Sequence, residues 1–150
     1  MLSQFLFLIV LFALVVAFDQ NPTKVKTDEI EGIICTNYAD WKSITGAKEF
    51  WMPSKQEVLK AEQRIQEHLK TNTERYADLW KKLPAYKRQY VGIIVNDRKR
   101  IFCNFFCFPD GPPSEKPMIV FDGGTCFFHI EYDVSDKNCY EFKANASAAH

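Results

Sequence analysis

The sequence lacks an excess of charge of either sign, and it lacks the residue spacings that hold metal ions. Lysine and arginine together number 19, as do aspartate and glutamate, so the formal net charge at pH 7 is zero. A chain without net charge has no long-range attraction for nucleic acid or anionic lipid. The histidines, His68, His129 and His150, form no His-x-x-x-His pattern, and no Cys-x-x-Cys pair is present. We therefore predict no nucleic-acid partner, no metal site and no cofactor.

Long apolar runs are also missing, except at the start of the chain. Residues 5–17 form an uncharged run of about 13 residues, whereas a bilayer-spanning helix needs roughly 20. Val15 and Ala17 are placed as a signal peptidase requires, so residues 1–17 are predicted to be a signal peptide cut after Ala17. A signal anchor is the alternative. Cleavage would make the protein secreted, extracellular or periplasmic, with no stable membrane insertion afterwards.

Cysteines are present in an odd number, at positions 35, 103, 107, 126 and 139. In an oxidising compartment they pair where geometry allows, and one at least stays free. Cys103 and Cys107 are roughly 13 Å apart in an extended strand, which is beyond disulfide reach. Cys126 and Cys139 are expected to face opposite sides of the sheet. The preferred disulfide is Cys107–Cys126 or Cys103–Cys126, and the alternative is that several thiols are buried as small apolar residues.

One helix is strongly indicated, over residues 54–70. Ser54 followed by Glu57 is the pattern of a capping box, in which each side chain bonds to the backbone amide of the other residue. Apolar residues then recur at helical spacing, at Val58, Ala61, Ile65 and Leu69. This pattern predicts an amphipathic helix with one face packed on an apolar surface. A second, shorter helix is expected over residues 73–82.

After residue 86 the pattern changes to strands separated by turns. We expect strands over residues 89–95, 100–108, 118–134 and 139–144, with a turn at 96–99. Gly123 and Gly124 are expected to make a bulge or bend in the third strand. Tyr132 is expected to pair with Tyr140 of the fourth. Residues 32–35 could form a further strand at the edge.

Laying the helix across the sheet buries the apolar face of each. The predicted fold class is α+β, with one long amphipathic helix packed on a four- to five-stranded antiparallel sheet. The predicted organisation is a signal peptide (1–17), a flexible N-terminal arm (18–31), a single α+β domain (32–144) and a disordered tail (145–150). Aromatic residues occur on both faces of the sheet, so the second face needs a cover. That cover could be residues 41–50, a partner chain or a hydrophobic ligand.

Two groups of residues could take part in catalysis. A Cys–His pair would form if Cys103 or Cys107 approached His129 across the sheet. Glu131 and Asp133 share one strand face, where they could act as acid and base, although we expect them to be its solvated side.

Two further surface features concern binding and modification. Basic residues at positions 87, 88, 98, 99 and 100 gather near the first hairpin, as a solvated turn or as a docking point for an acidic partner. Asn145-Ala146-Ser147 is a glycosylation sequon, which makes Asn145 a candidate site in a eukaryotic host.

The order of a helix followed by a strand meander resembles the architecture of the cystatins, secreted inhibitors of papain-type cysteine proteases. Cystatins insert an N-terminal glycine segment and two hairpin loops into the protease cleft. Gly32 precedes the helix as that glycine does, and Gln89-Tyr90-Val91 resembles the family's Gln-x-Val-x-Gly loop, whereas the family's Pro-Trp pair is absent from the meander. The resemblance covers the topology of residues 32–144. The candidate binding residues that it implies, with the hairpin tip, are Gly32, Gln89, Val91, Asn96, Asp97, Arg98 and Lys99.

Residues 50–54, 86–92 and 120–124 are also similar to a group of small secreted proteins without an assigned activity, which implies a family and no function. The sequence therefore favours a secreted, non-catalytic binding module that recognises a protease or another secreted protein. The most specific form of this hypothesis is a cystatin-like protease inhibitor. The alternatives are a carrier of a hydrophobic small molecule and a cysteine-dependent hydrolase.

Overall fold

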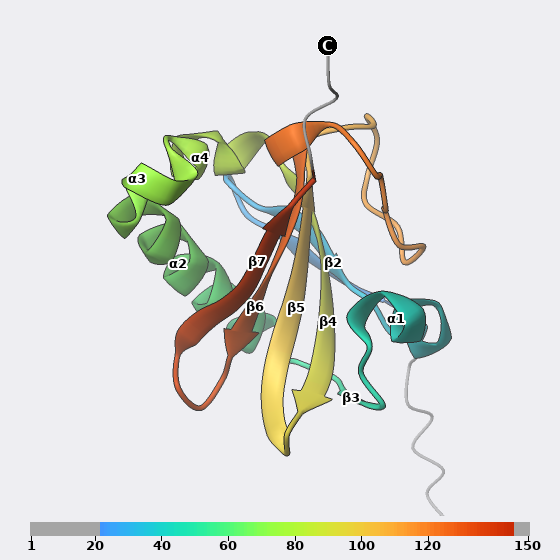
Figure 1. Cartoon of the computed structure of the whole chain (residues 1–150). Helices are drawn as coiled ribbons and strands as arrows, with labels where there is room; N and C mark the ends of the chain where they lie inside the picture. The colour runs from blue at the N-terminus through green and yellow to red at the C-terminus, as the bar shows by residue number, and fades with distance from the viewer. Residues whose placement is uncertain (1–21, 146–150) are drawn as a thin grey trace, which may run out of the picture.

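The predicted four-strand meander forms the centre of the structure. The computed structural model describes residues 22–145, and the meander comprises β4 (Lys87–Val95), β5 (Arg98–Phe106), β6 (Phe127–Asp133) and β7 (Asn138–Ala144) (Figure 1). Three further strands, β1 (Thr23–Lys26), β2 (Glu31–Ile34) and β3 (Glu49–Trp51), complete a seven-stranded sheet. The α+β class and the mostly antiparallel sheet are confirmed. The expected size of four to five strands is wrong.

The additional strands extend the sheet on the β4 side. Its order is β1-β2-β4-β5-β6-β7, and β3 pairs with β4 beyond the part that β2 occupies. β2 runs parallel to β4 and lies between β1 and β4, so residues 32–35 do not form an edge strand. Residues 23–26, expected in a flexible arm, pair with β2, and Val25 is fully buried. This short edge strand carries Lys24 and Lys26, a pattern that discourages pairing with other chains.

The expected long helix is α2 (Lys55–Thr71), and its start has the predicted capping box. The Ser54 hydroxyl accepts a hydrogen bond from the Glu57 amide at 3.2 Å, and the Glu57 carboxylate accepts one from the Ser54 amide at 2.8 Å. The expectation of a single long helix is wrong, because the structure adds α1 (Tyr38–Thr45), α3 (Thr73–Tyr76) and α4 (Leu79–Lys82). The helix expected over residues 73–82 divides at Ala77, whose φ of 48° lies outside the right-handed helical region. A 3-10 turn, η1 (Leu83–Ala85), then leads into β4.

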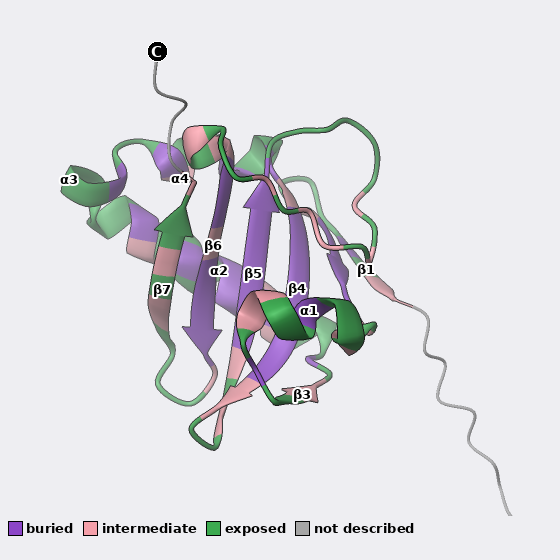
Figure 2. Cartoon of the chain, turned by 45° about the vertical axis from the view of Figure 1, so that its right-hand side comes forward, coloured by how far each residue is buried: buried purple, intermediate pink, exposed green. Residues whose placement is uncertain are grey.

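The helices lie on both faces of the sheet, with α2 on one side and α1 on the other (Figure 1, Figure 2). The four apolar residues of the predicted α2 stripe are buried in a core with β4, β5 and β6. On the opposite face, Trp41 of α1 is fully buried beside Ile93 and Phe102. The segment 41–50 therefore supplies part of the cover expected for this second face. The loop between β5 and β6 covers another part of it (Figure 2).

The first hairpin has a tighter turn than expected. Asn96 and Asp97 have φ values of 50° and 60°, which are those of a two-residue type I′ turn. Arg98 and Lys99 are paired residues of β5 and not part of the turn.

The third strand is shorter than expected and its register differs. Residues 118–121 form no strand, and β6 begins at Phe127 after a 3-10 turn, η2 (Gly124–Cys126). Gly123 and Gly124 have positive φ values, of 102° and 59°, so they make a bend ahead of β6 and not a bulge within it. A bulge does occur between His129 and Glu131, and it shifts the pairing with β7. Tyr132 consequently pairs with Cys139 and not with Tyr140.

Several predictions for the chain ends lie outside the described residues, namely the signal peptide (1–17), the first part of the arm and the tail after residue 145. Between residues 22 and 145, no helix is long and apolar enough to cross a membrane.

Candidate functional site

Three of the candidate binding residues lie inside the sheet, so the structure corrects their assignment. Gly32 is buried in β2, where an added Cβ would lie 2.5 Å from the ring of Tyr90. Gln89 and Val91 are buried in β4, with exposed fractions of 1% and 0%. Because β4 pairs along both edges, this segment is not a loop that could enter a protease cleft. Gly32 and Val91 pack within the sheet, whereas the Gln89 side chain binds the loop between β5 and β6.

The hairpin tip is on the surface, but its cations are engaged within the chain. Asn96, Asp97 and Lys99 are exposed, whereas Arg98 is only partly exposed and binds Asp133 at 3.0 Å and Asp136. The Lys99 ammonium lies 4.9 Å from the centre of the Trp51 ring. The two other arginines of the expected basic patch, Arg88 and Arg100, are also paired with carboxylates. All three arginines of the expected basic patch are therefore paired with carboxylates of the chain itself.

Glu131 and Asp133, expected on the solvated side of β6, are instead buried. Arg100 binds Glu131 at 3.0 Å and lies 3.6 Å from Asp133, which Arg98 also binds. These arginines neutralise both carboxylates and allow their burial. The pair thus joins the ends of two hairpins through ion pairs with Arg98 and Arg100.

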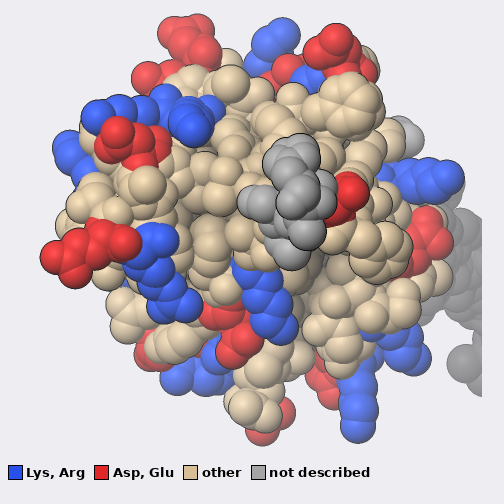
Figure 3. Space-filling view, turned by 45° about the horizontal axis from the view of Figure 1, so that its top comes forward, with Lys and Arg blue, Asp and Glu red and all other residues tan. Residues whose placement is uncertain are grey.

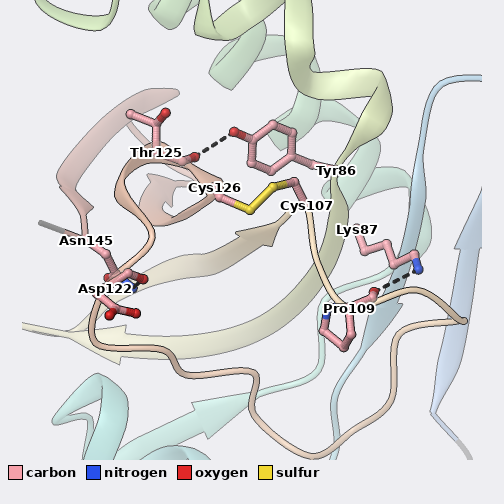
Figure 4. Close-up of a disulfide and its surroundings, with 8 residues drawn as sticks. All are labelled: Tyr86, Lys87, Cys107, Pro109, Asp122, Thr125, Cys126 and Asn145. Carbon is pink, nitrogen blue, oxygen red and sulfur yellow. Dashed lines mark hydrogen bonds between the residues drawn. A yellow bond between two sulfur atoms is a disulfide. The ribbon is translucent and has the colours of Figure 1, made fainter. Parts of the chain in front are cut away.

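The predicted Cys107–Cys126 disulfide is present, with Cα atoms 5.2 Å apart (Figure 4). Cys103, the other candidate partner of Cys126, is fully buried as a free thiol on the α2 side of the sheet. Its neighbour across the strands is Ile130, whereas His129 pairs with Asn104 and faces the opposite side. Burial raises the pKa of the Cys103 thiol well above its usual value. The expected Cys–His pair is not formed, because Cys107 is in the disulfide and Cys103 faces away from His129.

The disulfide closes the segment between β5 and β6, which we call the stapled loop (residues 107–126). The Tyr86 hydroxyl donates to the Thr125 carbonyl at 2.6 Å, and the Lys87 ammonium donates to the Pro109 carbonyl at 3.1 Å (Figure 4). The backbone amide of Cys107 also donates to the Cys126 carbonyl at 3.0 Å. Both ends of the loop are therefore fixed to the start of β4.

Two buried side-chain amides hold the middle of the stapled loop against the sheet. The Gln89 amide nitrogen donates to the carbonyls of Ser114 and Lys116, at 2.7 and 2.6 Å. The Gln89 oxygen accepts from the Met118 amide at 2.9 Å and from Asn104 Nδ2 at 3.1 Å. Asn104 Nδ2 also donates to the Met118 carbonyl at 2.9 Å. A long segment without regular structure is thus fixed by the same kind of hydrogen bonds that a strand would make.

Thr36 and Asn145 hold two further points of the stapled loop. The Thr36 hydroxyl donates to the Glu115 carboxylate at 2.7 Å. Asn145 Nδ2 donates to the carbonyls of Val120 and Asp122, the second at 3.2 Å (Figure 4). A glycan on Asn145 would be attached to this same nitrogen, so glycosylation would compete with the contacts that fix the loop.

The stapled loop exposes large apolar side chains although it is well fixed. Phe108, Ile119 and Phe121 are 63%, 45% and 93% exposed. In the view of Figure 3, the central part of the surface is largely uncharged, and charges of both signs are interspersed around it. A fixed loop that presents apolar side chains to solvent is typical of an interaction surface.

A cavity of about 420 Å³ separates part of the stapled loop from the sheet. Apolar side chains from α1, the loop and β6 make most of its wall, and Asn104, His129 and Asn145 are its polar members. The His129 ring stacks on Phe102, with 4.7 Å between the ring centres. Burial and the nearby Lys143 lower the pKa of His129, which favours a neutral imidazole.

The sequence does not reveal this site, because residues 118–121 have the pattern of a strand and Asn104 carries no local signal of a binding role. Four prolines and the Asp110-Gly111 pair between the two cysteines were the available signal for a long irregular loop. Within residues 22–145, no group of three His, Cys, Asp or Glu side chains is placed to hold a metal ion. No protein family, curated protein or solved structure matches the chain.

Proposed function

We propose that this chain is a non-catalytic binding module whose contact surface is the stapled loop. The observation that carries the proposal is the exposure of Phe108, Ile119 and Phe121 on a loop that a disulfide and two buried amides hold in place. Fixing a loop before binding lowers the entropy lost on association. Exposed aromatic side chains on such a loop are suited to filling a pocket on a partner.

The partner that we propose is another protein outside the cytosol. A disulfide is stable in oxidising compartments and rare where thiols are kept reduced, which supports an extracellular or periplasmic location. The apolar character of the exposed loop residues favours a protein surface over a charged polymer.

The cystatin-like version of this function has less support. The helix and the antiparallel meander suit it, but the residues that would contact the protease, Gly32, Gln89 and Val91, are buried. We expect micromolar protein to leave the activity of papain unchanged in a titration. Stoichiometric inhibition of papain would instead favour the cystatin-like inhibitor over the proposed binding module.

A carrier of a hydrophobic small molecule is the second candidate, because the cavity beneath the stapled loop has a volume of about 420 Å³. Ligand sites usually fall between roughly 300 and 1,000 Å³. Native mass spectrometry of the purified protein tests this alternative. A carrier should show an added mass from a bound small molecule, and a spectrum of the bare chain alone would count against it.

The test of the leading proposal compares two substitutions of exposed apolar residues. Phe121→Ser removes a side chain from the stapled loop, whereas Met52→Ser removes one that is 46% exposed and lies elsewhere. Proteins from the extracytoplasmic fraction of the source cells are passed over immobilised wild type and each variant. We expect a protein that the wild type and Met52→Ser retain and Phe121→Ser loses. Equal retention by all three would contradict a contact through the stapled loop.

A further inference from the structure

The polar groups in the floor of the cavity lie side by side. Asn104 on β5 and His129 on β6 are paired residues of neighbouring antiparallel strands, and both side chains line the cavity. The walls around them are mostly apolar and include Ile44, Met118 and Phe127, with Asn145 as the third polar member. Such a cavity binds an apolar group that carries one hydrogen-bonding function in a defined position.

The hydrogen bonds of the two buried amides determine which atom of Asn104 remains available. The Gln89 oxygen and the Met118 carbonyl both accept hydrogen bonds, so the Asn104 atom that contacts them must be the amide nitrogen. Its Oδ1 is the other atom, and no residue between 22 and 145 donates a hydrogen bond to it. Asn104 is only 6% exposed, and its side chain lines the cavity.

His129 supplies the complementary group. Its ring is positioned by stacking on Phe102, and neither ring nitrogen bonds to any other part of the chain that the structure describes. A neutral imidazole has one N–H donor and one acceptor nitrogen. The cavity floor therefore offers an acceptor on Asn104 next to a donor on His129.

A hydroxyl group on an apolar ring matches this arrangement. It can donate to one partner and accept from the other, whereas a phenyl ring would leave both groups buried without hydrogen bonds. A charged group would lose much of its hydration on entering a cavity whose wall is mostly apolar. The cavity wall also includes Ile119 and Phe121, so the site is continuous with the exposed surface of the stapled loop.

We propose that this cavity receives a tyrosine side chain of the partner protein, whose hydroxyl donates to Asn104 Oδ1 and accepts from the His129 imidazole. This inference rests on the proposed function, because it names the residue that the stapled loop recognises. Tyrosine suits the site because it buries a large ring with little loss of conformational freedom and carries one polar atom at its end.

The experiment titrates the isotope-labelled protein with N-acetyl-tyrosine amide and with N-acetyl-phenylalanine amide, and follows the backbone amide signals by NMR. The tyrosine compound is expected to shift the signals of Asn104, Ile119 and His129. It is expected to bind about thirtyfold more tightly than the phenylalanine compound, since each of the two hydrogen bonds contributes about 1 kcal/mol and 1.4 kcal/mol is a factor of ten.

Two histidine variants provide the matched comparison. His129→Phe keeps the stacking on Phe102 and removes the N–H, so the preference for the tyrosine compound should fall to about fivefold, the share of the remaining hydrogen bond to Asn104. His68→Phe changes a histidine on α2, outside the cavity, and should keep the full preference. Equal affinity of the two compounds in the wild type, shifts away from the cavity, or no binding at all would overturn the inference.

Failure of this inference can be distinguished from failure of the proposed function. If only the inference is wrong, the retained protein still depends on Phe121 while the two amides bind alike. If the proposed function is wrong, protein retention is independent of Phe121 whatever the amides do.

Discussion

Glu62 is a buried charged residue of α2 that binds two side chains of β4. Its carboxylate accepts from Arg88 at 3.1 Å and from the Tyr90 hydroxyl at 2.6 Å, and the Glu62 and Arg88 side chains are 6% and 2% exposed. Burial, and next the charge of Glu62, raise the pKa of Tyr90 well above its usual value, so Tyr90 stays a donor. The three side chains form a closed polar group inside an apolar core.

Replacing Glu62 should therefore destabilise the protein strongly. Glu62→Gln leaves the Arg88 guanidinium buried without a counter-charge, which typically costs about 3–5 kcal/mol. Glu67→Gln is the matched control, because its ion pair with Arg64 is about half exposed and such pairs contribute about 0–1 kcal/mol. Urea denaturation measures both losses, and similar losses for the two variants would contradict the importance of the buried group.

His129 and His68 should make the protein less stable in mild acid. Burial, with Lys143 near His129 and Arg75 near His68, lowers both pKa values below the ordinary 6.5. Below pH 6.5 the histidines of the unfolded chain therefore bind protons more readily than those of the folded chain. The free energy of unfolding decreases as the pH is lowered through this range. Denaturation at pH 7 and at about pH 5.5 should show this fall, and His129→Phe should reduce it. A constant or rising stability over that interval would contradict the assignment.

At the scale of elements, the disulfide should stabilise the fold and not only the loop. Cys107 and Cys126 are separated by 19 residues, and closing a loop of that length typically contributes about 2–4 kcal/mol. A variant with both cysteines changed to serine should lose about that much, measured by chemical denaturation. Wild type treated with a dithiol reductant should match this variant. Linkage of Cys107 to Cys35, Cys103 or Cys139 in a non-reducing peptide map would contradict the structure.

An element could be predicted from the sequence when the contacts that form it are close together in the sequence. The α2 helix was predictable, because Ser54, Glu57 and the apolar stripe are signals within one short segment. The inward side of β6 was also predictable, since Phe128, Ile130 and Tyr132 alternate along the strand. β1 and β2 are four residues each, and β2 joins the sheet by pairing with β4, which is distant in the sequence, so no local pattern shows this pairing.

The candidate site was less predictable than the fold for a similar reason. Gln89 looked like a binding residue, yet its side chain serves the loop from inside the sheet. Asn104 could not be predicted as a site residue, because its role depends on a contact with the stapled loop that the sequence does not show. The sequence narrowed the partner of Cys126 to Cys107 or Cys103. The structure pairs Cys126 with Cys107, and Cys103 lies in the core on the α2 side of the sheet.

At the scale of the whole molecule, a sheet with helices on both faces supports a loop that is irregular but fixed. α2 covers one face, and α1 shares the other with the stapled loop (Figure 2). Side chains of α1, the loop and β6 line the cavity. The arrangement explains why a loop with several exposed apolar residues needs a disulfide and buried amides. Without them, its apolar side chains would gain stability by folding inward.

Amide hydrogen exchange at Met118 tests the central claim that the stapled loop is fixed before any partner binds. The Met118 amide donates to the buried Gln89 oxygen, so it should exchange as slowly as amides of β4 and β5. Gln89→Leu should abolish this protection while the amides of β5 keep theirs. Exchange of the wild-type Met118 amide at the rate of an unstructured peptide would show that the loop is not held against the sheet, and would contradict the account.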